Sequence, residues 1–270
     1  MKVDLKKASL AQLLEFKTLY YDKIDFTIVK SSWDILSKKI SLPFVIHLVG
    51  TNGKGSTGRF LSHYLNKSKY KVLHYSSPHI INFNERIWIN GDNISDDLLE
   101  SAHKFLQELY PLNLLEKLTY FEYATLLSLY LSKDCDYLVL EAGLGGEFDA
   151  TNVVENDLSL ITTIGLDHQS FLGNTVEEIA ETKMRSVDNK MLIGYQVYES
   201  VYNTAVKVKE QISKERNKNI SIHKVLDFDK YELNSRFASY LKRNLHLVIA
   251  CLNELKIEID ISLFDDVKLF

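Results

Sequence analysis

The chain contains few of the residues that interrupt or cross-link a fold. Its 270 residues include only 3 prolines, 11 glycines and 2 cysteines. So little proline and glycine argues against long disordered segments. Cys135 and Cys251 lie far apart in apolar surroundings, which is typical of buried free thiols in a reducing compartment rather than of a disulfide. Any local cluster of glycines is therefore informative.

Long apolar runs and an excess of positive charge are also missing. The first 16 residues contain no apolar run of signal-peptide length, and no stretch approaches the ~20 apolar residues of a membrane span. We therefore expect a cytoplasmic protein without a membrane partner. The net charge of −4 provides no general positive field for nucleic acid, so we expect no nucleic-acid partner. No heptad pattern is present, which makes a monomer the default expectation.

Short apolar runs rich in β-branched residues alternate with amphipathic stretches. This alternation predicts an α/β fold with a doubly wound, mostly parallel sheet and helices on both faces. In such a sheet, ligands bind at the carboxyl ends of the strands. The expected strands are 43–49, 71–75, 137–140, 158–164 and 191–195, and the expected helices are 55–68, 95–110, 120–132, 175–183, 197–218 and 240–255.

A glycine cluster follows the first strong strand and precedes a helix. Glycines let a backbone approach phosphate oxygens, the helix N-terminus adds partial positive charge, and Lys54 supplies a mobile cation. The strict pattern G-x-x-x-x-G-K-[ST] is not met, because Leu48 stands at its first position and Gly55 follows the lysine. The alternative is a glycine-rich turn with a solvated lysine. The predicted phosphate loop comprises Gly50, Thr51, Asn52, Gly53, Lys54, Gly55, Ser56 and Thr57.

Two further side chains follow predicted strands and so belong to the same edge of the sheet. Glu141 ends one apolar run and precedes a glycine turn. A carboxylate there is the hard oxygen ligand that magnesium requires beside nucleotide phosphates. His168 follows the next strand, and Asp167 beside it could orient its imidazole. A lone histidine is more often structural than a metal ligand.

The loop GTNGKGST resembles the ATP loop of the Mur ligase superfamily, specifically the family of dihydrofolate synthase/folylpolyglutamate synthase. Four further groups of residues agree with that family in order and spacing, and the resemblance covers about residues 20 to 255. It implies the P-loop fold of the Mur ligase central domain. The matching segments are SSPH at 76–79 with FNERI at 83–87, YFEY at 120–123, LEAGLGG at 140–146 with DATN at 149–152, and LDH at 166–168 with LGNT at 172–175.

The resemblance implies a metal site and a modified lysine. The positions that match Ser77, Glu141 and His168 hold Mg²⁺ in the family, and the lysine that matches Lys183 is carbamylated. Lys54, Lys183 and His168 are thus the expected catalytic residues. The family usually shows EKAGI around this lysine, whereas the chain has TKMRS at 182–186. A helix-end lysine placed by the macrodipole is the alternative reading of Lys183.

The same resemblance assigns substrate and nucleotide contacts. Asn244, at the start of a late helix, matches an asparagine that contacts the nucleotide. The aromatic cluster near residue 121 is expected to line the pterin site, although packing is the commoner role of such a cluster. The loop near residue 85 is expected to cover the active site, and a bare surface turn is its alternative. The predicted substrate residues are Asp25, Phe26, Thr27, Ile28, Asn84, Arg86, Phe121, Glu122, Tyr123, Asp149 and Asn152.

These implications together predict an ATP-dependent ligase. It joins L-glutamate to dihydropteroate, or to folate glutamate tails, through an acyl phosphate. Residues 1–262 are expected to form the ATP-binding domain, and 263–270 to begin a linker to a C-terminal domain that is absent, so the chain alone could be inactive. The alternatives are a Mur-type ligase with another substrate and a degenerate nucleotide-binding protein without ligase activity.

Overall fold

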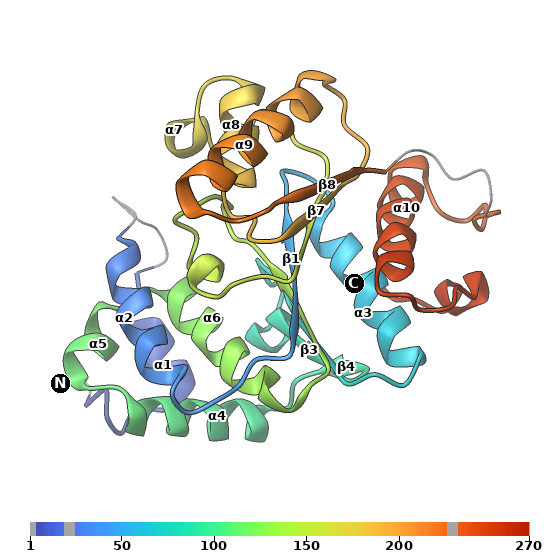
Figure 1. Cartoon of the computed structure of the whole chain (residues 1–270). Coiled ribbons are helices and arrows are strands. Elements are labelled where there is room, and N and C mark those ends of the chain that lie inside the picture. Colours follow the sequence, from blue (N-terminus) through green and yellow to red (C-terminus); the bar gives the residue numbers. More distant parts are fainter. Residues whose placement is uncertain (1–3, 19–24, 226–231, 270) are drawn as a thin grey trace.

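The centre of the protein is a mixed sheet of eight strands with the order β4-β3-β2-β5-β1-β6-β7-β8. The computed structural model describes residues 4–18, 25–225 and 232–269 (Figure 1). The six strands from β2 to β8 in this order are parallel, and the β3–β4 hairpin adds two antiparallel strands at one end. The bounds are β1 Phe44–Val49, β2 Val72–Tyr75, β3 Ile87–Ile89, β4 Asp92–Asn93, β5 Tyr137–Glu141, β6 Leu158–Ile161, β7 Lys190–Ile193 and β8 Ser221–Lys224.

Helices cover both faces of this sheet (Figure 1). One face carries α3 and α10, and the other carries α1, α2, α4, α5 and α6 at one end and α8 and α9 at the other. The doubly wound, mostly parallel fold predicted from the sequence is therefore confirmed. The bounds are α1 Leu10–Glu15, α2 Phe26–Leu36, α3 Lys54–Lys67, α4 Asp96–Leu109, α5 Leu112–Lys117, α6 Tyr120–Leu131, α7 Gln169–Leu172, α8 Val176–Met184, α9 Ser200–Arg216 and α10 Ser239–Glu254.

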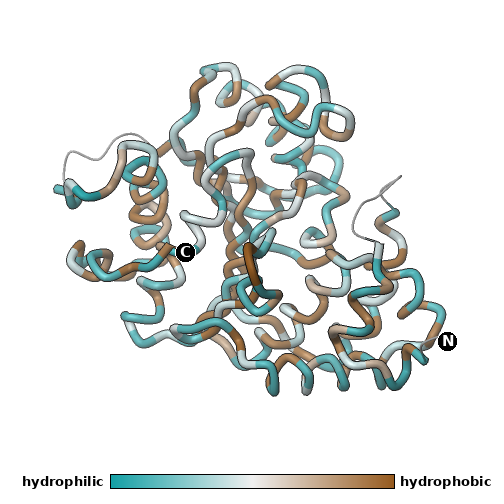
Figure 2. Tube along the Cα trace, turned by 180° about the vertical axis from the view of Figure 1, so that it is seen from behind, coloured by the Kyte–Doolittle hydropathy of each residue, from teal (hydrophilic) through white to brown (hydrophobic). Residues whose placement is uncertain are grey.

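The central strand β1 shows why the sheet is covered on both sides. Its side chains alternate between the faces, as the twofold period of a strand requires. Val45 packs with the α6 group of helices, Ile46 and Leu48 pack with α3 and α10, and Val49 packs with α8 and α9. Figure 2 shows the hydrophobic residues gathered along these central strands and the hydrophilic ones on the outer loops.

Several elements of the structure were not predicted from the sequence. The hairpin strands β3 and β4 are only 3 and 2 residues long, too short for a periodic pattern. Strand β8, the short helices α1, α5 and α7, and helix α2 were also missed. The strand expected at 158–164 is shorter in the structure, where β6 ends at Ile161.

The last described residues pack against α3. Phe264 lies in a short 3₁₀ turn, Ile261–Phe264, and is 1% exposed beside Phe60 and Tyr64. Asp266 then pairs with side chains of α3. The predicted domain boundary at 262 thus falls inside this turn, and the assignment of 263–270 as a linker stays a prediction, with Phe270 outside the described residues.

Both cysteines are free thiols, as expected from the sequence. Cys251 is fully buried, whereas Cys135 is only partly buried. In the described part of the chain, no helix is long and apolar enough to cross a bilayer.

Two glycines of α3 provide a matched test of this packing. A Cβ added at Gly58 would stand 2.2 Å from His74 Nε2 and 2.7 Å from Leu48 Cδ1, whereas one at Gly55 meets only Glu141 Oε2 at 3.6 Å. We expect Gly58→Ala to destabilise the fold by about 1–3 kcal/mol through overpacking. Gly55→Ala should be neutral or stabilising by up to ~1 kcal/mol, because alanine favours the helix. Urea unfolding measures both, and equal effects of the two changes would contradict this packing.

Candidate active site

Four connecting segments meet at the carboxyl edge of the parallel strands. They follow β1, β2, β5 and β6, and each carries residues singled out in the sequence. The register of the strands places these segments together, because Leu48 pairs with Glu141 and Tyr75 pairs with Leu140. This is the edge at which ligands bind in open α/β sheets.

The phosphate loop is held by the segment that follows β6. The backbone N–H groups of Thr51 and Asn52 both donate to Thr163 O at 3.0 Å. Gly53 then caps α3 with a left-handed φ of 90°, and a Cβ there would stand 2.7 Å from Asn244 Oδ1. Both the conformation and the close approach require glycine. The loop therefore leads into α3 with its first N–H groups open to an anion.

The predicted nucleotide contact Asn244 reaches this loop. Its Nδ2 donates to Ser56 Oγ at 2.8 Å, and this bond joins α10 to the start of α3. Ser56 Oγ in turn donates to Gly53 O at 3.2 Å. Thr57 is fully buried in the first turn of α3. The structure thus brings Asn244 and the phosphate loop together.

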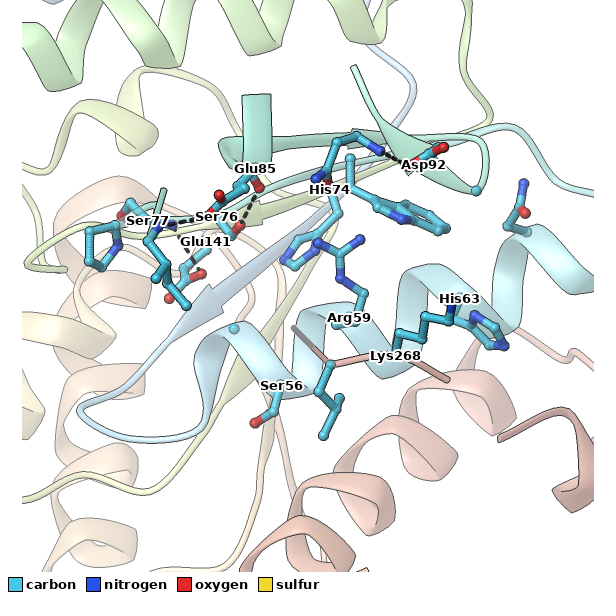
Figure 3. Close-up of a pocket in the computed structure, with 18 of the residues that line it drawn as sticks. Ser56, Arg59, His63, His74, Ser76, Ser77, Glu85, Asp92, Glu141 and Lys268 are labelled. Carbon is cyan, nitrogen blue, oxygen red and sulfur yellow. Dashed lines mark hydrogen bonds between the residues drawn. The ribbon is translucent and has the colours of Figure 1, made fainter. Parts of the chain in front are cut away.

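Lys54 and Ser77 lie on either side of the Glu141 carboxylate. Lys54 Nζ donates to Gly50 O at 3.1 Å and lies 4.0 Å from Glu141 Oε1. The backbone N–H of Ser77 donates to Glu141 Oε2 at 3.4 Å. Figure 3 shows Ser77 and Glu141 at one end of a large cavity, into which Ser56 also opens. The three predicted residues therefore form one group at the mouth of the phosphate loop.

Glu141 is a buried carboxylate whose negative charge is only partly compensated by its neighbours. It is 4% exposed, and burial raises its pKa from 4.5 to about 7, against the opposing effects of Lys54 and the Ser77 N–H. A group in this state gains stability when a cation binds to it. Its oxygens and the nearby Ser77 hydroxyl are the donors that Mg²⁺ prefers, so the residues present fit a magnesium ion.

His168, the third predicted metal ligand, belongs to the neighbouring segment. It has a left-handed φ of 48°, and its Nε2 lies 3.5 Å from Asp167 Oδ2. Its side chain is about half exposed, and Asp167 is the partner that the structure gives it. Within residues 4–18, 25–225 and 232–269, no three His, Cys, Asp or Glu side chains are grouped as a metal site. The role of His168 therefore stays a prediction.

Lys183 is almost fully buried beneath the glycine turn that follows β5. It is 2% exposed, and its Nζ donates to Leu144 O at 2.5 Å. Gly145 has a φ of 83°, and a Cβ there would stand 3.1 Å from the lysine Nζ. Burial, followed by the charge of Lys54, lowers the pKa of Lys183 from 10.5 to about 8, although Asp149 and Asp167 oppose the shift.

Asp149 shapes the same turn. Its Oδ2 accepts from Gly145 N at 2.8 Å, and its Oδ1 accepts from the Thr151 N–H and hydroxyl at 3.0 and 2.6 Å. The Thr151 hydroxyl lies 2.9 Å from Nε2 of His47 on β1. Asn152 Nδ2 donates to Glu147 O at 2.9 Å. Asp149 and Asn152, predicted as substrate contacts, thus both hold the turn that covers Lys183.

The predicted pterin segment begins α6 beside this turn. Phe121 lies under Gly143, where a Cβ would stand 2.6 Å from its ring. The Glu122 carboxylate accepts from the Thr119 N–H at 2.8 Å in a capping box, and burial raises its pKa. The Tyr123 hydroxyl is buried against His103 Nδ1 at 2.7 Å. Glu122 and Tyr123 therefore have structural partners, and Phe121 is the member nearest the glycine turn.

The segment Asp25–Ile28 lies on the same side of the sheet as α6. Asp25 caps α2 by accepting from Thr27 N at 3.0 Å. The Phe26 ring centroid lies 6.3 Å from that of Phe148, in the glycine turn, and Ile28 packs against the core around α6.

Asn84 and Arg86 lie in a 3₁₀ turn between β2 and β3, Phe83–Arg86. The Asn84 side-chain amide donates to Ile94 O and Asp96 Oδ1, both at 2.8 Å, so it ties this turn to the start of α4. Arg86 Nε donates to His79 Nδ1 at 2.8 Å, and its guanidinium lies 5.2 Å from the Tyr120 ring. Arg86 is thus turned toward the pterin segment.

Sequence reasoning missed Lys17, which is 7% exposed below the start of α6. Its Nζ donates to Leu115 O and lies 5.7 Å from the ring of Tyr123. Burial lowers its pKa to about 8, opposed by the charge of Glu122. Lys17 belongs to no motif and lies about 100 residues from its partners, so no local pattern could have identified it.

Comparison with protein-family models agrees with this geometry. The model of the Mur ligase middle domain matches residues 48–265. The dihydrofolate synthase/folylpolyglutamate synthase of Haemophilus influenzae is 43% identical over 157 residues, which are 57% of this chain and 35% of the relative. The protein of the same name from Bacillus subtilis is 44% identical over 146 residues, 51% and 33% of the two chains.

Solved structures share the fold over almost the whole chain. Helicobacter pylori folylpolyglutamate synthetase is 35% identical with a TM-score of 0.77, and the match covers 96% of this chain and 65% of that one. Escherichia coli FolC in complex with ADP is 26% identical, also with a TM-score of 0.77, over 96% and 64%. The chain thus spans about a third of the curated relatives it matches and under two thirds of the similar structures.

Glu141 gives a testable pH dependence in the metal-free protein. In the folded protein the pKa of Glu141 is raised from 4.5 to about 7. The protonated side chain therefore makes its full contribution to the free energy of unfolding below about pH 4.5, and this contribution is lost as the pH rises through 7. We expect Glu141→Gln in EDTA to be more stable at pH 8 by up to about 3 kcal/mol, from 1.36 kcal/mol per pH unit. Urea unfolding at pH 5 and 8 measures this difference.

Glu108→Gln, at an exposed position of α4, is the control and should change stability little at either pH. Loss of stability in Glu141→Gln at pH 8 would show that the carboxylate does not carry an uncompensated charge.

Proposed function

The chain belongs to the Mur ligase middle domain family, and from this premise we propose that it is the ATP-binding part of a ligase that adds L-glutamate to dihydropteroate or to folate glutamate tails. The observation that carries the proposal is the group formed by Lys54, Ser77 and Glu141 at the open end of α3. Its relatives are named dihydrofolate synthase/folylpolyglutamate synthase, and similar structures hold ADP, or an ATP analogue with L-glutamate. We further propose that it acts in the cytoplasm, as a monomer.

The proposed reaction has two displacements. A substrate carboxylate oxygen attacks the γ-phosphorus of ATP, and the bond between this phosphorus and the β–γ bridging oxygen breaks. ADP departs, and the substrate carboxylate has become an acyl phosphate. The amine of L-glutamate then attacks the acyl carbon, phosphate departs, and the amine proton goes to solvent. Charge accumulates on phosphate oxygens in both steps, so catalysis depends mainly on positioning and electrostatics.

The chain's own groups suit these demands. We expect the N–H groups that begin α3 and the Lys54 ammonium to bind the transferred phosphoryl group. Ser77 and Glu141, with His168 as the third predicted ligand, would hold Mg²⁺, which supplies positive charge to the phosphate oxygens. The contact between Lys54 and Glu141 supports an active loop over a degenerate one.

Removal of the Lys54 ammonium tests the proposal. The chain is assayed alone and fused to the remaining third of the Helicobacter pylori enzyme, and phosphate release is followed with Mg-ATP, L-glutamate and dihydropteroate. We expect release that depends on both co-substrates in the fusion, and a fall on the order of 10²–10³ in Lys54→Ala, the cost of losing one charge-stabilising donor. Lys207→Ala, at an exposed position of α9, should keep full activity. Release independent of glutamate and dihydropteroate would overturn the substrate assignment.

We also propose that Lys183 is carbamylated. A neutral Nζ attacks the carbon of CO₂, an N–C bond forms, and one proton is released to give an anionic carbamate. Support comes from the burial of Lys183 and from its pKa of about 8, which leaves a substantial neutral fraction near neutral pH. The carbamate would replace a buried cation, beside Lys54, with an anion that attracts metal.

The pH dependence of carbamylation follows from this pKa. At a fixed concentration of dissolved CO₂, we expect the carbamate to increase steeply from pH 7 to 8 and less steeply above pH 8. Below the pKa both deprotonation of the amine and the proton released with the carbamate favour it, and above the pKa only the second effect remains. A carbonyl signal from ¹³C-labelled CO₂ in the NMR spectrum measures it, and Lys183→Arg should remove the signal. Equal labelling of the Arg variant would show that another amine reacts.

A further inference from the structure

The cavity beside the phosphate loop extends well beyond the proposed catalytic group (Figure 3). It has a volume of about 1000 Å³ and lies between α3 and the strands β2, β3 and β4. One end holds Ser56, Ser77 and Glu141. Toward the other end, Arg59 and His74 line the wall. These two residues play no part in the mechanism proposed above.

Arg59 has no carboxylate partner in the described part of the chain. Its guanidinium carbon lies 4.9 Å from the centre of the Trp88 ring. Among the described residues it forms no hydrogen bond or ion pair. The charge of Asp92 raises its pKa, but the Asp92 carboxylate accepts from Asn93 N at 2.7 Å. Burial lowers the pKa of Arg59 to about 10, so it remains charged at neutral pH. Its N–H donors are therefore uncommitted at the cavity wall.

His74 is the second unsatisfied group. It is 1% exposed, and neither ring nitrogen has a hydrogen-bond partner within the described parts of the chain. Its Nε2 lies over the bare Cα of Gly58. Burial and the charge of the neighbouring Arg59 hold its pKa well below the usual value, so the ring is neutral with one N–H donor. A buried polar group without a partner requires an explanation such as a ligand or ordered water.

We propose that Arg59 and His74 form a subsite for a small oxyanion, a carboxylate or a phosphate, in this cavity. The planar guanidinium matches two oxygens of such a group, and its contact with the Trp88 ring helps to position it. The imidazole N–H adds a third donor from β2. Arg59 stands one helical turn after Ser56, so an ion held here lies beside the phosphate loop and not within it.

The proposed reaction contains two small oxyanions that could bind at this subsite: a carboxylate of L-glutamate and the released inorganic phosphate. The subsite itself does not depend on ligase activity, since it consists of residues that the mechanism does not use. Binding can therefore be tested without turnover, and failure of the ligase proposal would leave it intact.

Trp88 provides the reporter, because the chain has only two tryptophans, Trp33 and Trp88. The indole N–H signals are recorded by NMR while inorganic phosphate, L-glutamate or L-glutamine is added at constant ionic strength, and Trp33→Phe assigns them. We expect saturable movement of the Trp88 signal at millimolar phosphate or L-glutamate, with Trp33 unmoved. L-Glutamate acting where L-glutamine does not would identify the side-chain carboxylate as the ligand, and phosphate alone would identify the product.

Three variants locate the site. Arg59→Gln should abolish the movement of the Trp88 signal, and His74→Leu should weaken binding several-fold. Lys54→Ala should retain it, because the phosphate loop is separate. Lys133→Gln, which removes a cation 4.9 Å from the Tyr130 ring outside the cavity, is the charge control and should bind normally.

The proposal is overturned if neither anion moves the Trp88 signal, if movement persists in Arg59→Gln, or if Lys54→Ala abolishes it. His74→Leu also separates a binding role from a structural one. If the ring nitrogens of His74 have no hydrogen-bond partner in the free protein, the leucine variant should have a higher urea midpoint. If they have a partner within the fold, the midpoint should be lower.

Discussion

The arrangement of the site depends on the register of β5 between β1 and β2. Leu48 of β1 pairs with Glu141, and Ala142 N donates to Leu48 O at 3.0 Å. Tyr75 of β2 pairs with Leu140, which brings Ser77 to the same carboxylate. Because side chains alternate along a strand, a slip of one residue would turn Glu141 to the opposite face of the sheet. The contacts of Glu141 with Lys54 and Ser77 therefore rest on hydrophobic pairing deeper in the sheet.

Burial then sets the electrostatics of this edge. Glu141 is buried with its pKa raised, and Lys183 is buried with its pKa lowered, so both are less willing to carry charge than in water. Lys54 connects the two, since its charge stabilises the carboxylate of Glu141 and disfavours the protonated form of Lys183. A cation near Glu141 and an anion near Lys183 would stabilise these groups, and the proposed metal binding and carbamylation would supply both.

The sequence predicted the parts of the site that depend on local chain geometry. Three segments of the site each follow an apolar strand: the phosphate loop, the segment after β2 and the turn after β5. In the phosphate loop and the turn after β5, the left-handed φ of Gly53 and Gly145 explains why the sequence has glycine there. The sheet class followed from the alternation of apolar runs. The hairpin β3–β4 did not, because strands of 3 and 2 residues carry no period.

Contacts between distant residues were beyond sequence reasoning. Lys17 contacts α5 and α6, and Arg59 of α3 lines the same cavity as His74 of β2, but nothing in the spacing of these residues signals a pairing. The same limit applies to roles. The substrate contacts expected of Asn84 and Glu122 stay predictions. In the structure the Asn84 amide donates to Asp96 at the start of α4, and the Glu122 carboxylate accepts from Thr119. A side chain marked by a motif can therefore also hold the backbone in place.

The unusual residues around Lys183 can be understood in this way. Arg185 Nε donates to Glu147 Oε2 at 2.8 Å, and its other nitrogens reach Glu147 and Glu215. Glu147 belongs to the glycine turn that covers Lys183, so Arg185 ties the end of α8 to that turn. Met184 is fully buried, and Ser186 Oγ donates to Lys183 O at 2.8 Å. These residues pack and bond around the lysine, and its pKa of about 8 arises within their network. Their difference from the usual family pattern is thus an alternative support for the same buried amine, which weighs against reading the chain as a degenerate nucleotide-binding protein.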